Sequence, residues 1–292
     1  MIDAGLSDKV VLITGANHGI GAATAKAFAI QGAKVFISYM RISPEAYGIS
    51  EEEAKNAAQP GLPMYHAKRM MSASMVVDEI RENGGQAESF ESDLAEVANI
   101  PLLFDRAEDA FGHVEILVNN AAHWESDTFT PQPRVSFLSS DRANQTITKE
   151  SHDRHFAVNS RAVALMMAEF AGRVVKHGIR WGRIINISTD GASAFPGEAS
   201  YGASKHAMES YSRAAACELG KYGITVNIVS PGPTQTDYIS RELEEKLIPD
   251  IPLGRLGQPK DIADAIIFFA SEQASWITGQ LIYVGGGHVM SL

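Results

Sequence analysis

The chain has 292 residues, a formal net charge of −10 and one cysteine, Cys217. Its 45% hydrophobic and 21% charged residues are typical of a soluble globular protein and exclude a disordered chain. The negative charge argues against nucleic-acid and anionic-membrane partners, which need clustered Lys and Arg. A single cysteine excludes an internal disulfide and a multi-cysteine metal site. We therefore predict no metal site, and we expect Cys217 to be a small core residue.

The start of the chain lacks a positively charged segment followed by an apolar stretch, and no apolar run is long enough to span a bilayer. We expect no secretory signal and residence in the cytoplasm. The expected partner is a small molecule or another copy of the chain.

Short apolar runs alternate with helical patterns along the whole chain. The expected strands are 10–13, 35–37, 87–92, 116–118, 184–187, 226–229 and 281–284, and the expected helices include 22–30, 75–83, 100–111, 160–177 and 205–222. This alternation implies parallel pairing, because each parallel strand needs a crossover that returns over the sheet. The predicted fold is a single α/β domain over residues 1–292, a doubly wound parallel sheet of the Rossmann type.

Two stretches interrupt this pattern, near residues 42–69 and 124–150. Both contain several prolines and show no sustained apolar periodicity, so we interpret them as loop insertions that have no core of their own. Each follows the carboxyl end of an expected strand, where ligands bind in such sheets. Surface decoration and a pocket lining are equally good interpretations of the first, and a pocket lining is favoured for the second. Residues 236–253 are predicted to form a substrate lid or a solvated amphipathic helix.

A glycine-rich turn lies between the first expected strand and the first expected helix. Gly15 permits a tight turn, Gly19 allows close approach of backbone to a phosphate, and Gly21 lets the helix pack near the strand. The following helix start presents free N–H groups to an anion. A structural turn is the simpler alternative, but this position in an alternating chain favours a dinucleotide site.

Tyr201 and Lys205 are four residues apart, hence about one turn apart on one face of a helix. A nearby cation stabilises a phenolate, so the pair suits proton transfer. Taken alone, the pair is better interpreted as an exposed helical pair.

These motifs occur together with Asn-Asn-Ala at 119–121, Asn159 and Pro231-Gly232. In this order and spacing they resemble the short-chain dehydrogenase/reductase family over nearly the whole chain. The last third resembles its ketoreductase and 3-oxoacyl-acyl-carrier-protein reductase-like members. The resemblance implies an oxidoreductase that transfers a hydride between a nicotinamide cofactor and a carbonyl or alcohol.

The resemblance also implies residue roles. Tyr201 is the expected general acid, Lys205 holds the nicotinamide ribose and lowers the pKa of Tyr201, and Asn159 holds a water that links Lys205 to solvent. Asn119 braces the central strands, Asp93 contacts the adenine, and Thr236 contacts the nicotinamide carboxamide. The full set expected at the cofactor is Gly15, Asn17, His18, Gly19, Ile20, Gly21, Tyr39, Arg41, Asp93, Leu94, Asn119, Ala121, Tyr201, Lys205, Pro231, Gly232, Thr234 and Thr236.

Two positions depart from the family pattern. Ala122 stands where the family has glycine, and a positive φ there would strain the backbone. The substrate-orienting hydroxyl is Ser188 when counted back from Tyr201 and Thr189 when counted along the strand. Strand register favours Thr189, because loops absorb deletions more easily than strands.

The cofactor preference depends on the end of the second expected strand, which reads Ser38-Tyr39-Met40-Arg41. An NAD enzyme usually has a carboxylate there for the ribose 2′-hydroxyl. Its absence, and the chance for Arg41 to pair with a 2′-phosphate, favour NADPH over NAD.

The sequence therefore predicts an NADPH-preferring carbonyl reductase. The alternatives are an NAD-dependent alcohol dehydrogenase of the same family and a catalytically silent nucleotide-binding sensor or scaffold. The resemblance suggests a homotetramer or homodimer in which helices 160–177 and 205–222 pair between subunits. Candidates for the substrate pocket are Trp124, Phe129, Phe195, Tyr238 and His288.

Overall fold

The computed structural model describes residues 3–131 and 145–289. Its main sheet contains seven parallel strands in the order β3-β2-β1-β4-β7-β8-β9. In chain order their bounds are β1 Val10–Thr14, β2 Lys34–Tyr39, β3 Gln86–Glu91, β4 Ile116–Asn119, β7 Gly182–Ile187, β8 Ile224–Pro231 and β9 Leu281–Val284. The predicted doubly wound α/β fold is confirmed.

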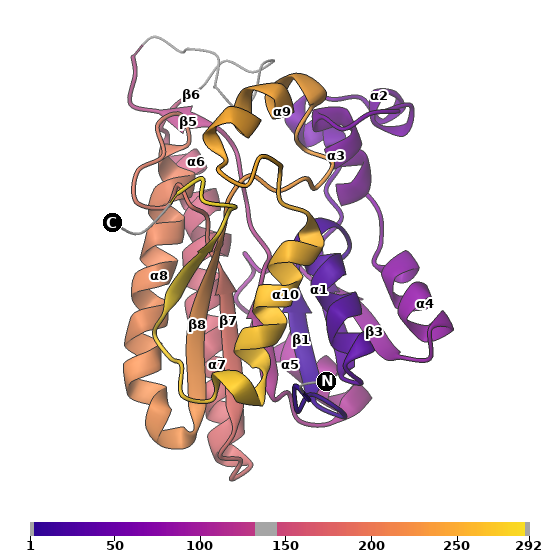
Figure 1. Ribbon diagram of the computed structural model, residues 1–292, viewed down its shortest axis with the longest axis vertical. Coiled ribbons are helices and arrows are strands. Elements are labelled where there is room, and N and C mark those ends of the chain that lie inside the picture. The colour runs from indigo at the N-terminus through magenta and orange to yellow at the C-terminus, as the bar shows by residue number, and fades with distance from the viewer. Residues whose placement is uncertain (1–2, 132–144, 290–292) are drawn as a thin grey trace.

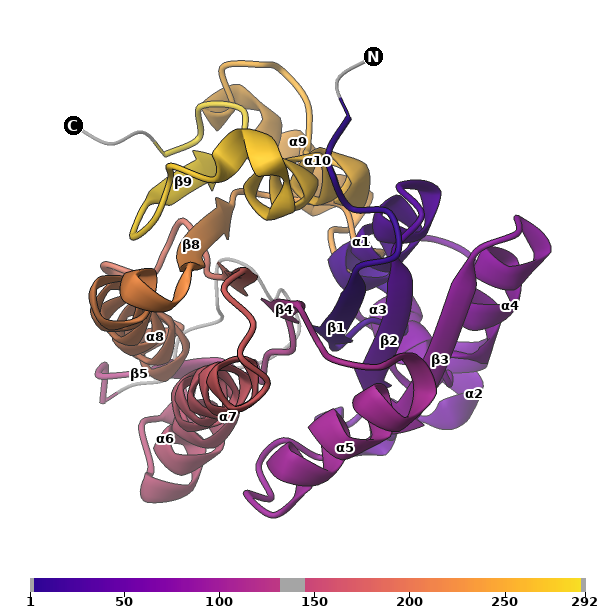
Figure 2. The same ribbon diagram turned by 90° about the horizontal axis from the view of Figure 1, so that it is seen from below.

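Helices cover both faces of the sheet (Figures 1 and 2). On one face lie α1 (Gly19–Ile30), α4 (Ser74–Glu82) and α10 (Pro259–Ala270), and on the other lie α5 (Asn99–Phe111), α7 (Val163–Lys176) and α8 (Ala199–Leu219). Side chains alternate across each strand, so Val11 and Ile13 of β1 join the first core and Val10 and Leu12 join the second. Burial on both faces explains why these strands are continuous apolar runs in the sequence.

The strand order reverses direction between β1 and β4. In such sheets this reversal opens a crevice beyond the carboxyl ends of the strands. Asn119 at the end of β4 donates from its Nδ2 to Oδ1 of Asn186 on β7 at 2.8 Å. This buried bond is the predicted brace between the central strands.

The predicted helix 160–177 is the second half of a longer one. α6 (Lys149–Phe156) is preceded by its N-cap residue Thr148, whose side chain accepts from the Ser151 amide. The helix continues through a π-helical turn at Ala157–Ala162 into α7. The hydroxyl of Ser151 in turn accepts from the Thr148 amide, a reciprocal cap that fixes this start. α8 likewise begins at Ala199, six residues before the predicted start.

The prediction of a loop at 42–69 is wrong. The segment contains a 3-10 turn (Pro44–Tyr47), α2 (Glu51–Lys55) and α3 (Leu62–Arg69). Its buried contacts are aromatic and cationic: the Tyr47 and His66 ring centroids lie 4.3 Å apart, and Cζ of Arg69 lies 4.8 Å from the Tyr47 centroid. A search for apolar periodicity does not detect such a cluster.

The second insertion is described only in part, because residues 132–144 lie outside the described ranges. Two short strands, β5 (Asp127–Thr128) and β6 (Gln145–Thr146), pair in parallel at its ends. Buried Asp127 accepts from the Ser200 amide at 2.8 Å and from the Ser151 hydroxyl at 3.0 Å. These bonds tie the insertion to the starts of α6 and α8.

The predicted lid at 236–253 contains α9 (Arg241–Leu247) and a 3-10 turn at Ile248–Asp250. Its apolar side chains form a small separate cluster of Ile239, Leu243, Leu247, Ile251 and Leu256. In Figure 1 this segment lies at the top of the molecule beside α3, and the Gly61 amide donates to the Asp237 carbonyl at 2.9 Å.

Cys217 is exposed, so its predicted core position is wrong. On α8 the preceding Ala216 occupies the buried position, and one helical step turns Cys217 outward. Within residues 3–131 and 145–289, no helix combines the length and the apolar character needed to cross a membrane.

Candidate active site

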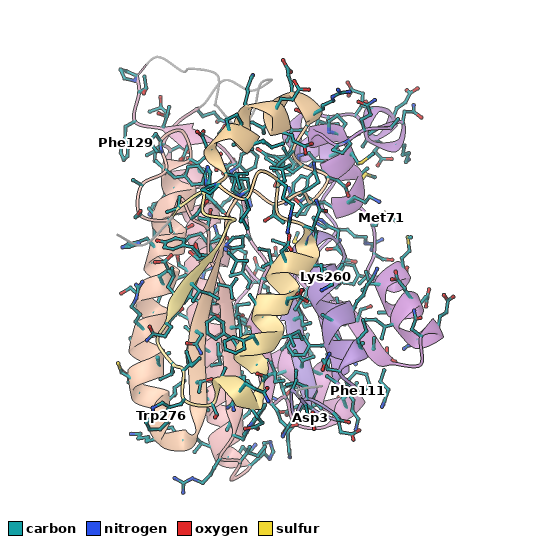
Figure 3. The ribbon with its side chains drawn as sticks, viewed as in Figure 1. Asp3, Met71, Phe111, Phe129, Lys260 and Trp276 are labelled. Atoms are coloured by element: carbon teal, nitrogen blue, oxygen red, sulfur yellow. The ribbon has the colours of Figure 1, made fainter. Side chains whose placement is uncertain are left out.

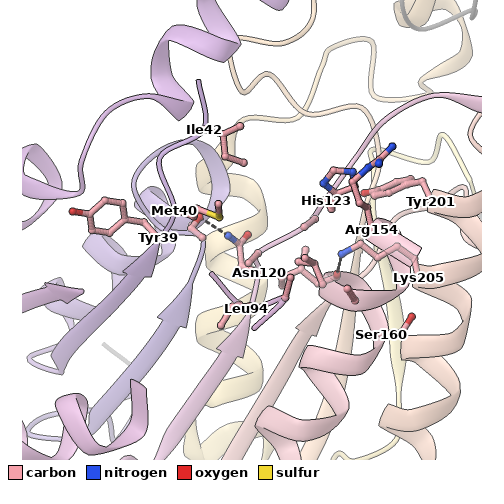
Figure 4. Close-up of a pocket in the computed structure, with 18 of the residues that line it drawn as sticks. Tyr39, Met40, Ile42, Leu94, Asn120, His123, Arg154, Ser160, Tyr201 and Lys205 are labelled. Atoms are coloured by element: carbon pink, nitrogen blue, oxygen red, sulfur yellow. Dashed lines mark hydrogen bonds between the residues drawn. The ribbon is translucent and has the colours of Figure 1, made fainter. Parts of the chain in front are cut away.

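A cavity of about 1330 Å³ lies at the carboxyl ends of the strands. The glycine turn and the end of β2 line one side, and Tyr201 and Lys205 of α8 line the other (Figure 4). Of the residues predicted from the sequence, this cavity brings together Gly15, Asn17, His18, Gly19, Ile20, Gly21, Tyr39, Asp93, Leu94, Ala121, Ser188, Thr189, Tyr201, Lys205, Pro231, Gly232, Thr234 and Thr236. Arg41, Asn119 and Asn159 do not line it.

Close contacts leave no room for a side chain at two glycines of the turn. Gly15 has φ +65°, and a Cβ there would lie 2.7 Å from Cα of Ala121. A Cβ on Gly21 would lie 2.4 Å from the Gly15 carbonyl oxygen, so only glycine lets α1 begin this close to β1. The start of α1 therefore lies close to β1 at the edge of the cavity, an arrangement that fits a dinucleotide pyrophosphate.

Asn120 holds this turn in place, a role that the sequence analysis missed. Its Nδ2 donates to the carbonyl oxygens of Thr14 and Gly15 at 2.9 and 2.8 Å. The hydroxyl of Thr14 accepts from the amides of Asn120 and Ala121, both at 3.0 Å. Among the described non-glycine residues, only Asp8 and Asp237 have a positive φ. Ala122 therefore does not carry the backbone strain that a positive φ would have caused.

Tyr201 and Lys205 project from the first turns of α8 into the inner end of the cavity (Figure 4). Lys205 Nζ donates to the Ile187 carbonyl at 2.8 Å and lies 5.9 Å from the Tyr201 ring centroid. Burial lowers the pKa of Lys205 to about 8. Burial, together with Glu198, Tyr65 and Asp190, raises the pKa of Tyr201 well above its ordinary value. The phenol is therefore protonated at neutral pH.

Asn159 lies in the π-helical turn and is buried behind the cavity. Its Nδ2 donates to the His123 carbonyl and the Ser204 hydroxyl, both at 2.9 Å, and its Oδ1 accepts from the His123 amide at 2.8 Å. Asn159 thus links the chain after β4 to α8, one residue from Lys205. π-Helical turns are frequent at functional sites.

The two candidate substrate hydroxyls differ in their partners. Ser188 Oγ is buried and donates to Oε1 of Glu209 at 2.6 Å. Thr189 Oγ1 accepts only a long contact of 3.5 Å from the Gly191 amide. Both residues line the cavity, and of the two only Thr189 donates no hydrogen bond from its hydroxyl to a described residue.

Arg41 follows β2 as expected, but it contacts Glu91 instead of the cavity. Its Nε donates to Oε2 of Glu91 at 2.9 Å, its Nη2 lies 2.7 Å from the same oxygen, and its side chain is 58% exposed. Arg41 in turn lowers the pKa of Glu91. The carboxylate nearest to the end of β2 is therefore paired with a cation.

Aromatic side chains from three segments meet near Tyr201. Tyr238 of the lid lies edge-on to Tyr65 of α3 and to Trp124 of the second insertion, with centroid distances of 5.4 and 5.6 Å. Phe195 lies 6.1 Å from Tyr201 by ring centroids. Of the other candidates, Phe129 is 83% exposed and points outward (Figure 3).

Glu198, another residue that the sequence analysis missed, is buried beside this aromatic group. Its Oε2 accepts from the Trp124 indole N–H, and its Oε1 has no hydrogen-bond partner among the described residues. Burial raises the pKa of Glu198 to about 7. Nearby, Nδ1 of His288 contacts Oδ2 of Asp190 at 2.7 Å.

Family profiles match this chain over most of its length. One described as short chain dehydrogenase matches residues 9–47, and one described as enoyl-(acyl carrier protein) reductase matches residues 44–288. The chain belongs to the short-chain dehydrogenase/reductase family. The chain is accordingly an oxidoreductase of a family that uses NAD(P)(H).

Relatives that align over nearly their whole length are also named as oxidoreductases or reductases. An uncharacterized oxidoreductase of Bacillus subtilis is 33% identical over 97% of both chains. A hydroxynaphthalene reductase-like protein of Metarhizium guizhouense is 31% identical over 97% of this chain and 96% of its own. The crystal structure of a dehydrogenase/reductase from Sinorhizobium meliloti superposes with a TM-score of 0.76 at 30% identity, covering 97% of this chain and 96% of the other.

The raised pKa of Glu198 predicts a pH-dependent stability. A carboxyl group whose pKa rises from 4.5 to about 7 on folding stabilises the folded state below pH 4.5, and this contribution is lost as the pH rises through 7. Glu198→Gln should therefore gain stability relative to the unmodified protein, by up to about 3 kcal/mol between pH 4 and pH 8. Urea unfolding at several pH values measures this difference.

Glu218→Gln, which alters an exposed carboxylate on the same helix, is the matched control. A Glu198→Gln protein whose relative stability stays constant across this pH range contradicts the raised pKa.

Proposed function

We propose that this protein is an NADPH-preferring carbonyl reductase in which Tyr201 supplies the proton. The observation that carries the proposal is the position of Tyr201 in the cavity beside the buried Lys205, whose Nζ lies 5.9 Å from the Tyr201 ring centroid. When bound there, a reduced nicotinamide supplies the hydride that the carbonyl carbon accepts.

Tyr201 donates its proton to the carbonyl oxygen as the carbon is reduced, which leaves a phenolate. Lys205 stabilises that phenolate as the nearby cation. Asn159 links the chain after β4 to α8 next to Lys205, through hydrogen bonds with His123 and Ser204. Thr189 donates a hydrogen bond from its hydroxyl to the same carbonyl oxygen, since Ser188 is engaged by Glu209.

The reductive direction is favoured over alcohol oxidation by the raised pKa of Tyr201. Reduction needs the neutral phenol, which the folded protein stabilises, whereas oxidation needs the phenolate. The reductase name of the Metarhizium relative agrees with this direction. The aromatic group of Tyr65, Trp124 and Tyr238 suits a flat or cyclic apolar ketone. A catalytically silent scaffold would have no physical need for this proton-transfer set.

NADPH is favoured by the residues at the end of β2. Tyr39 and Met40 follow where an NAD enzyme has its acid, and the carboxylate of Glu91 is bound by Arg41. A 2′-phosphate at the end of β2 would therefore be repelled less than beside an unpaired acid.

We also propose a homotetramer or homodimer that pairs α7 and α8 between subunits. Val175 on α7 and Tyr211 on α8 are exposed large hydrophobic side chains on these helices. Such side chains favour contact with another copy of the chain.

Tyr201→Phe tests the central assignment. Removal of the hydroxyl should lower kcat for NADPH-dependent ketone reduction by about 10²- to 10⁴-fold, because the proton donor is lost. The dissociation constant for NADPH should stay within about threefold, since other residues build the cofactor cradle. Tyr222→Phe, at the end of the same helical region and away from the cavity, controls for substitution itself. Full activity of the Tyr201→Phe protein would remove the proposed role.

Thr189→Ala and Ser188→Ala separate the two hydroxyls. Thr189→Ala should lower kcat/KM by about 100-fold with little effect on stability, because it removes a donor to the developing oxyanion. Ser188→Ala should chiefly lower the free energy of unfolding, by about 1–3 kcal/mol, because buried Glu209 loses a partner. Steady-state kinetics and urea unfolding distinguish them, and the opposite pattern would assign the role to Ser188.

The cofactor preference is tested by titrating the protein with NADPH and NADH and following nicotinamide fluorescence. NADPH should bind at least about tenfold more tightly, since its extra phosphate is repelled less than beside an unpaired acid and can form charge-assisted bonds. Tighter binding of NADH would instead favour the NAD-dependent alcohol dehydrogenase.

A further inference from the structure

Arg69 is a buried cation with no acidic partner among the described residues. It is 6% exposed and ends α3 in the first insertion, where its guanidinium stacks on Tyr47 and lies 5.5 Å from the Tyr65 ring centroid. No carboxylate of residues 3–131 and 145–289 lies within 4.0 Å of it, and its guanidinium has no hydrogen bond to another described group. The buried Arg183, in contrast, has Glu272 at 3.8 Å. Within the described parts of a chain with ten excess negative charges, this guanidinium is thus not neutralised.

An anion bound in the cavity would contact Arg69 from the cavity side. Arg69 lines the dinucleotide cavity together with the glycine turn and the residues after β2. Its carbonyl accepts from the Ile42 amide at 3.3 Å, and two residues later the Met71 carbonyl accepts from Nδ2 of Asn17 at 2.9 Å. The end of α3 is therefore bonded both to the chain after β2 and to the glycine turn.

The neighbouring histidine adds no positive charge. His18, at the start of α1, has its ring centroid 5.5 Å from that of Tyr65 and is mostly enclosed. Burial, followed by the positive charges of Arg69 and Lys68, lowers the pKa of His18 to about 4. At neutral pH its ring is uncharged, so Arg69 is the buried cation on this side of the cavity.

A buried guanidinium that faces a cavity and lacks a carboxylate partner is costly unless an anion joins it. Its planar set of N–H donors matches phosphate oxygens in a two-point geometry. We propose that Arg69 binds a phosphate group of the bound dinucleotide, so that the inserted segment 42–71 closes on the cofactor as a clamp. This inference rests on the proposed dinucleotide-dependent function. It replaces Arg41, which Glu91 occupies, as the phosphate-binding arginine.

Two phosphates of the dinucleotide have the required chemistry. The 2′-phosphate occurs only in NADP(H) and would lie near the end of β2, where Ile42 and Met40 line the cavity. The pyrophosphate occurs in both dinucleotides and would lie at the start of α1. Comparison of NADPH with NADH therefore identifies which phosphate Arg69 contacts.

The same segment also contributes to the aromatic group of Tyr65, Trp124 and Tyr238. α3 carries Arg69 at its end and Tyr65 one turn earlier, and Tyr65 packs edge-on against Tyr238 of the lid. The amide of Gly61, just before α3, donates to the carbonyl of Asp237. Binding of a phosphate by Arg69 would thus fix the same helix that forms part of the aromatic group above Tyr201.

The experiment compares Arg69→Met and Arg69→Lys in the full-length protein. Met removes the charge and keeps an apolar contact with Tyr47, whereas Lys keeps the charge but loses the planar donor set. Binding of NADPH and NADH is measured by nicotinamide fluorescence, and thermal unfolding without cofactor reports whether the insertion remains folded. Lys68→Ala, an exposed cation on the same helix, and Arg41→Ala are the matched controls.

We expect Arg69→Met to raise the NADPH dissociation constant about 10- to 100-fold, Arg69→Lys to raise it less, and both controls to change it less than threefold. A loss confined to NADPH assigns the 2′-phosphate, and an equal loss for NADH assigns the pyrophosphate. Unchanged binding of both dinucleotides by Arg69→Met overturns the inference and leaves the proposed function intact. A second pattern also overturns the inference. In it, the weaker binding of Arg69→Met is accompanied by a lower unfolding temperature, whereas Arg69→Lys keeps both the wild-type affinity and the wild-type unfolding temperature. Arg69 would then serve only the packing of α3. Failure of the unmodified protein to bind either dinucleotide would instead defeat the proposed function.

Discussion

The site depends on the close approach of three backbone segments where the sheet reverses its strand order. The turn after β1, the start of α1 and the chain after β4 meet so closely that a Cβ at Gly15 or Gly21 would overlap its neighbours. Asn120 and Thr14 fasten these segments with hydrogen bonds that satisfy backbone groups near the cavity. Because these contacts hold the segments together, the start of α1 lies at the edge of the cavity, with Tyr201 across it.

Charges that are buried without a full set of partners give the cavity its chemical character. Burial lowers the pKa of Lys205 and raises those of Tyr201 and Glu198, so the charged form of each group is less stable than it would be in water. A polar ligand would restore partners that water no longer supplies. The low local dielectric also strengthens any hydrogen bond that forms with a substrate or cofactor.

The sequence predicted the sheet because most of its strands are short apolar runs between helical patterns. It also predicted Gly15, Gly21 and Asn119, whose contacts bear out the turn, the close helix and the brace between strands. It did not predict the helices of 42–69, since Tyr47, His66 and Arg69 form a buried cluster without apolar periodicity. Likewise, no local pattern indicates that Glu91 engages Arg41, because the two residues are fifty positions apart. Pairing between distant charges is a property of the folded chain.

The π-helical turn at Ala157–Ala162 divides one long helix into two halves with separate rotational phases. An α-helix turns by about 100° per residue, so one surplus residue in the backbone offsets everything that precedes it from everything that follows. His155 lies on the half that faces Tyr201, whereas Phe170 lies on the half that packs on the sheet. Because the turn separates the two rotational phases, a shift of α7 on the sheet need not rotate α6 by the same amount.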